Sequence, residues 1–189
     1  MDIKKMKDDI KGVFTEYNKI FEIRKKENYK EICEGLKPYE TVPDPKNITK
    51  FKGTTRDYLT KDLTDLRTKG LDIVDSSLKE LNDYKTQAPD PNAMNYINML
   101  ASRKKLTTND LDMAVQKYGD NYSCYKALED ISSERHIPMN YRNNADEIET
   151  VLNDTRRSFD NINVQSCEQG NASAGAVAFQ NMLIDGLKE

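Results

Sequence analysis

The sequence predicts an all-α protein in which a long helical hairpin or coiled coil is followed by a compact bundle of short helices. Apolar residues recur at intervals of three and four along most of the chain, and no segment shows the alternation typical of a half-buried strand. Hydrophobic residues make up 37% and charged residues 32% of the chain. Typical globular chains have roughly 45–50% and about 25%. This composition suits elongated helices that each bury one narrow stripe, so we expect about two-thirds of the residues to be helical.

The first predicted helix covers residues 2–36 and contains a heptad-like seam. The seam consists of Ile3, Met6, Ile10, Val13, Tyr17 and Ile20. Its spacing alternates between three and four residues, as in the a and d positions of a coiled coil. The register breaks across residues 24–28. The seam can pack against the second long helix of the same chain or against another chain. The regular spacing favours another chain, and the sequence therefore predicts homo-oligomerisation.

A connector over residues 37–55 precedes the second long helix. Pro38, Pro43 and Pro45 break the helical pattern there, and Thr54 or Thr55 is the predicted N-cap of the next helix. Two neighbouring apolar tracks then run along that helix. The first contains Leu59, Leu63, Leu66, Gly70 and Ile73, and the second contains Leu71, Val74, Leu78 and Leu81. Such a drifting double stripe predicts packing against more than one neighbour.

The chain after residue 88 has shorter elements. Asp90 is a predicted N-cap with Pro91 in the first helical position, and Thr107 with Asp110 forms a capping-box pattern. A further helix is predicted from about Asn144 to Phe159. These signals predict a long-helix region over 1–86, a compact helical subdomain over 88–160 and a polar, marginally ordered tail over 161–189.

The sequence holds little material for catalysis or metal binding. It has one histidine, three cysteines and eight glycines, whereas acid–base, metal and phosphate-cradling sites draw on such residues in clusters. His136 stands alone beside Arg135 at the end of a predicted helix, where a cation is favourable. We therefore expect no enzyme activity, no catalytic residues, no bound metal and no cofactor.

Cellular location is predicted from the cysteines and from hydropathy. Cys33, Cys124 and Cys167 are odd in number and scattered, which favours a reducing compartment. No apolar run approaches the roughly 20 residues of a membrane span, and the N-terminus lacks the apolar core of a signal peptide. The sequence therefore predicts a cytoplasmic protein without a membrane partner.

One segment of the connector is basic and is a candidate for phosphate contacts. It contains Lys46, Lys50, Lys52 and Arg56, with Phe51 between them and no acid from 46 to 56. Such a loop can hold phosphates while its ring stacks on a base. The alternative is a solvated linker, which the sequence favours because nucleic-acid binding usually needs a broader basic face.

Residues 106–137 have the size of a helix-turn-helix unit. Two predicted helices are separated by a tight turn at residues 118–121. Acids outnumber bases over the second helix, residues 122–135. A recognition helix should present bases and amides to the DNA groove, so a packed helical hairpin is the favoured interpretation.

The segment MLASRKKLTTNDLDMAVQKYGDNYSCYKALEDISSERHI, residues 99–137, resembles proteins encoded in the head-morphogenesis region of tailed phages and prophages of Firmicutes. The resemblance covers about a fifth of the chain and depends on positions that cap helices or form their core. It implies a scaffold-like or minor virion component and carries no catalytic residues with it. Cys124, Tyr125 and the long polar tail depart from the pattern.

These observations together predict a non-enzymatic structural or assembly protein. It is expected to act through homo-oligomerisation and contacts with other proteins, in the host cytoplasm or in a virion if a phage encodes it. The alternative is a nucleic-acid-binding regulator that uses the basic loop 46–56 and the unit 106–137.

Overall fold

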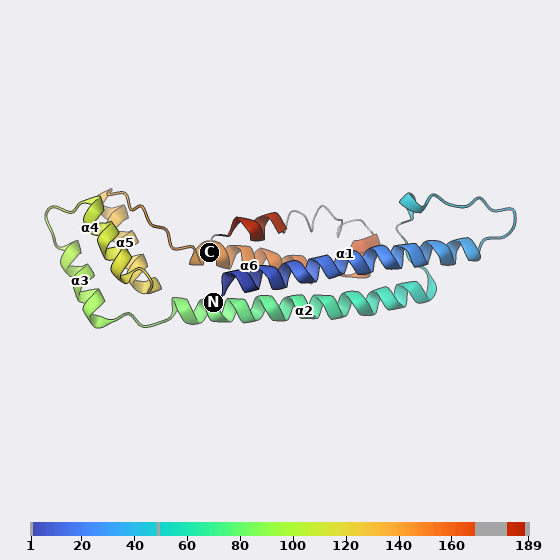
Figure 1. The fold of residues 1–189 in the computed structure, drawn as a ribbon, viewed down its shortest axis with the longest axis horizontal. Helices are drawn as coiled ribbons and strands as arrows, with labels where there is room; N and C mark the ends of the chain where they lie inside the picture. The colour runs from blue at the N-terminus through green and yellow to red at the C-terminus, as the bar shows by residue number, and fades with distance from the viewer. Residues whose placement is uncertain (1, 49, 169–180, 188–189) are drawn as a thin grey trace. The chain divides into compact units, whose positions relative to one another are not determined.

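In the computed structural model, which describes residues 2–48, 50–168 and 181–187, the chain is helical and has no strand among those residues (Figure 1). The predicted all-α class is therefore confirmed. The elements are α1 (Ile3–Glu34), the 3₁₀ turn η1 (Pro45–Asn47), α2 (Gly53–Lys85), α3 (Pro91–Ala101), α4 (Thr108–Tyr118), α5 (Tyr122–Arg135), α6 (Ala145–Asp160) and α7 (Val164–Glu168). Residues 181–186 are also helical.

The chain forms two compact units. The long-helix unit consists of Asp2–Ser77 and Val151–Glu189, and the short-helix unit consists of Leu78–Thr150. This division differs from the predicted one over 1–86, 88–160 and 161–189. Helices α2 and α6 each give residues to both units, so the breaks at residues 88–93 and after 160 mark turns in the chain and do not separate the units.

In the long-helix unit α1 and α2 form an antiparallel hairpin (Figure 1). Three bonds between side chains join them, from Thr54 to Glu31 at 2.9 Å, from Arg24 to Asp62 at 3.1 Å and from Lys69 to Glu16 at 3.0 Å. As the residue number falls along α1 it rises along α2, which is the signature of antiparallel packing. The hairpin alternative of the predicted architecture is the one that the structure shows.

The predicted oligomer seam on α1 is core of the single chain. Met6, Ile10, Val13 and Tyr17 are between 1% and 5% exposed, while Ile3 and Ile20 at its ends are partly buried. The prediction that the seam faces another chain is therefore wrong for its four central residues. One cause is a third helix that the spacing alone did not reveal: Phe159 of α6 stacks on Phe14 of α1, with ring centroids 4.7 Å apart.

Part of the predicted tail also packs in the long-helix unit. The hydroxyl of Tyr17 lies 3.1 Å from the thiol of Cys167 in α7, and both side chains are buried. Further on, Lys7 donates to the carbonyl of Leu187 and Lys11 pairs with Asp185. Ile184 is fully buried. Residues 161–168 and 181–187 are thus integral to the unit, whereas 169–180 and 188–189 lie outside the described residues.

The short-helix unit is built around α5, against which α3 and α4 both pack. Ile97, Leu100, Leu111 and Leu128 lie in its core and are at most 1% exposed. The predicted caps of this region are confirmed. Asp90 accepts the backbone N–H of Asn92, and Thr107 with Asp110 forms the complete capping box.

The start of α2 differs in detail from the prediction, whereas α6 begins at Ala145, within one residue of the predicted start. Helix α2 begins at Gly53, so Thr54 and Thr55 lie in its first turn instead of capping it. Both threonines hydrogen-bond Glu31 and lower the pKa of its carboxyl group, the larger effect being that of Thr55. At α6 the backbone carbonyl of Asn144 accepts the first helical bond, while the side chain of Asn143 accepts the N–H of Ala145.

Candidate interaction and anion-binding surfaces

The connector between α1 and α2 exposes two apolar side chains. Tyr39 is 99% and Val42 58% exposed. Pro38 and Pro43 restrict the backbone beside them, since a proline ring fixes φ. Pro38 and Tyr39 lie within a short turn in which the N–H of Glu40 donates to the carbonyl of Lys37 at 3.0 Å. The connector therefore presents a tyrosine and a valine on a chain with reduced freedom.

A buried asparagine fixes the end of this connector where it enters α2. Asn28 of α1 is 0% exposed. Its side-chain oxygen accepts the N–H of Lys52 at 2.9 Å, and its side-chain nitrogen donates to the carbonyl of Lys50 at 3.4 Å. A buried amide that meets both backbone partners in this way satisfies groups that would otherwise be costly to bury.

The predicted basic segment 46–56 is split by the fold. Phe51 is 2% exposed and packs edge-on against Phe21 at 6.0 Å. The interpretation in which its ring stacks on a base is therefore wrong, because the ring is core. Arg56 pairs with Glu168 at 2.6 Å. Lys50 and Lys52 are exposed and turn only their backbone toward Asn28.

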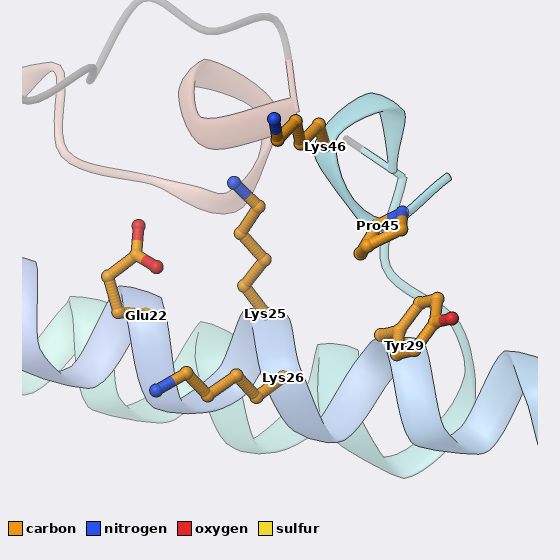
Figure 2. A pocket seen from close by; sticks show the side chains of 6 residues that line it. All are labelled: Glu22, Lys25, Lys26, Tyr29, Pro45 and Lys46. Carbon is orange, nitrogen blue, oxygen red and sulfur yellow. The ribbon is translucent and has the colours of Figure 1, made fainter. Parts of the chain in front are cut away.

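Lys46 lines an open hollow together with residues of α1. The hollow has a volume of about 270 Å³ and is lined by Glu22, Lys25, Lys26, Tyr29, Pro45 and Lys46. Figure 2 shows the side chains of Lys25 and Lys46 extending toward one another from α1 and η1. The contribution of α1 was missed from sequence. Its signal was the break in the heptad register across residues 24–28, where two lysines stand side by side.

In the helix-turn-helix-like unit, the basic side chain near the start of α5 is engaged by acids. Lys126 of α5 pairs with Glu129 and lies 3.6 Å from Asp146. The hydrogen bond to Glu129 raises the pKa of Lys126 to about 12. The hydroxyl of Tyr122 donates to Asp146 at 2.7 Å. This charge pattern leaves the start of α5 poorly suited to phosphate.

Lys85, at the end of α2, connects to the same cluster. Its ammonium lies 2.6 Å from both Asp146 and Glu149, and its side chain is 15% exposed. Burial lowers the pKa of Lys85, but the bonds to the two carboxylates outweigh it and the pKa is raised. The pKa of Asp146 is lowered, first by the bond from Lys85 and then by the bond from Tyr122. The cluster therefore joins α2, α5 and α6 within the short-helix unit.

Among the described residues, no group of three or more histidine, cysteine or acidic side chains is placed to hold a metal ion. His136 ends α5 in the left-handed conformation at φ 55°. Burial raises the pKa of the thiols of Cys124 and Cys167. None of the helices in the described ranges is long and apolar enough to cross a bilayer.

Comparison with known proteins identifies no relative. No family model matches the chain, and no curated protein or solved structure matches it.

Proposed function

We propose that this protein is a non-enzymatic, scaffold-like structural or assembly protein that acts through oligomerisation and contacts with other proteins. The observation that carries the proposal is the exposure of Tyr39 and Val42 on an anchored connector. The resemblance of residues 99–137 to phage head-region proteins supports a role in virion assembly in particular.

The connector has the properties of a protein contact site. Single exposed apolar residues are ordinary on protein surfaces. Here, however, the exposed pair stands among prolines on a chain whose end is bound by Asn28. Tyrosine offers a large contact area with few rotatable bonds, and a restricted backbone loses little entropy on binding. Tyrosine is also enriched among residues that dominate interface energies.

The contact site that we propose differs from the seam predicted from the sequence. Because the central residues of the α1 seam are buried in the core of the long-helix unit, contacts with further chains must use residues that remain exposed. Tyr39 is the most exposed of the large hydrophobic side chains among the described residues. We therefore assign self-association to the connector.

A comparison of variants by light scattering tests this proposal. The wild type is expected to show a mass above the 21.7 kDa of one chain. The Y39S/V42S variant should return to that mass with unchanged helicity, because both side chains are exposed. The control is Y58S, which removes a side chain that is 57% exposed on α2 and that Arg24 covers. The proposal fails if Y39S/V42S leaves the mass unchanged or if Y58S lowers it equally.

The alternative of a nucleic-acid-binding regulator has weaker support. Phe51 is buried, Arg56 is paired with Glu168, and Lys126 is held by Glu129 and Asp146. The aromatic ring and two of the basic groups that supported the alternative are thus engaged within the chain. Lys46, Lys50 and Lys52 remain exposed, and of these Lys46 lines a hollow together with two lysines of α1.

A further inference from the structure

The hollow between α1 and η1 brings together like charges. Lys25 and Lys46 point toward one another across it, whereas Lys26, which also lines it, extends along α1 away from them (Figure 2). The two ammonium groups carry like charges, and bringing them close together costs free energy even where solvent screens part of the repulsion. An anion placed between them removes that cost and adds hydrogen bonds.

Lys25, Lys26 and Lys46 form no ion pair within the described residues, whereas the neighbouring Arg24 is paired with Asp62. Residues 169–180 contain no charged residue at all. Glu22 is the one acid in the lining, against three lysines. Asp44 is next to the hollow in sequence, but its carboxylate accepts the backbone N–H of Lys46 at 2.9 Å.

We propose that this hollow binds a phosphate group through Lys25 and Lys46. Phosphate carries up to two charges and several acceptor oxygens, and each lysine offers a compact charge with three donors. Tyr29 and Pro45 form an apolar wall beside the lysines, suited to the uncharged part of a phosphate-bearing ligand. The phosphate can belong to a free phosphate compound or to a single-stranded nucleic acid, and the experiment separates these sources.

The test uses the full chain at low salt. Inorganic pyrophosphate and a short single-stranded oligonucleotide are titrated separately and followed by amide shifts in NMR spectra. We expect shifts at residues 25–29 and 44–46. The K25Q/K46Q variant should weaken binding at least about fivefold, the scale of losing two charge-assisted contacts that are partly screened by water. Both side chains reach solvent, so the fold should persist.

The matched control is K19Q/K61Q, which removes the same charge from two exposed lysines of α1 and α2. If K25Q/K46Q weakens pyrophosphate binding and K19Q/K61Q does not, the hollow is a site for free phosphate compounds. Loss confined to the oligonucleotide supports a backbone phosphate of nucleic acid. The proposal is overturned if neither probe binds, or if the control loses as much affinity as K25Q/K46Q. None of these outcomes bears on the mass measured for assembly.

Discussion

Gly70 of α2 lies against the ring of Phe159 of α6: a Cβ atom at Gly70 would stand 2.7 Å from the Cδ1 and Cε1 atoms of that ring. The ring is 0% exposed and is itself stacked on Phe14 of α1. The missing side chain of one residue thus makes room for the helix that completes the long-helix core.

The close contact predicts the effect of G70A. Alanine favours a helix over glycine by about 1 kcal/mol, but the added methyl overlaps a ring that has no space to move. Overpacking of this kind costs about 1–3 kcal/mol, and we expect a net loss of stability in urea unfolding. Gly12 of α1 provides the control, because a Cβ there meets nothing within 4 Å. G12A should raise stability by about 0.5–1 kcal/mol. Equal effects of the two changes would contradict the packing described.

Asn28 should be needed to hold the connector against α1. In N28A the N–H of Lys52 and the carbonyl of Lys50 lose their partner. We expect a loss of about 1–3 kcal/mol, the usual cost of leaving a buried polar group unsatisfied. Hydrogen exchange at the amide of Lys52 reports the contact directly and should accelerate more than exchange in α5. Unchanged exchange at that amide would show that the bond does not hold the connector.

The Lys85–Asp146 pair should make stability depend on pH at the acid end. The pKa of Asp146 is lowered from 3.8 in the folded state, so its contribution is present above that value and is lost as the pH falls through the folded pKa. D146N should therefore cost about 0.5–1 kcal/mol near pH 7, a figure reduced because the carboxylate is half exposed. The difference from wild type should vanish in strong acid. A difference that is constant across this range would contradict the ion pair.

Thiol labelling should distinguish the three cysteines. Cys124 and Cys167 are buried and burial raises the pKa of their thiols, whereas Cys33 is partly exposed. A neutral alkylating reagent should modify Cys33 faster by a factor on the order of 100, since the other two need local opening. C33S should remove the fast phase. A fast phase that survives C33S would show that one of the buried thiols is accessible.

The fold could be predicted from sequence where the signal is local. The capping box at Thr107 and the Asp90–Pro91 start depend on contacts a few residues apart, and the structure has both. The burial of Leu59, Leu63 and Leu66 likewise follows from their spacing. The element that packs on an apolar face cannot be predicted in this way, since periodicity shows that the face is apolar without showing its partner. The α1 seam was therefore assigned to another chain, although this chain's own core buries it.

The candidate surfaces were harder to predict because they join distant segments. Lys46 was identified within a basic run, but Lys25 and Lys26 join it only once α1 and η1 are folded together. The basic segment also suggested that Phe51 could stack on a base, whereas its side chain is buried in the core. Tyr39 and Val42 stood in the connector as apolar residues between prolines, a signal that the helical periodicity did not include.

The central claim, that this chain assembles through its exposed connector, is tested most directly by sedimentation equilibrium of the wild type. The concentration should run from about 1 to about 100 µM, which covers dissociation constants in the micromolar range. The account predicts an average mass that rises from 21.7 kDa toward a multiple of it, with the rise absent in Y39S/V42S. A wild type that stays at 21.7 kDa across the whole range would contradict it.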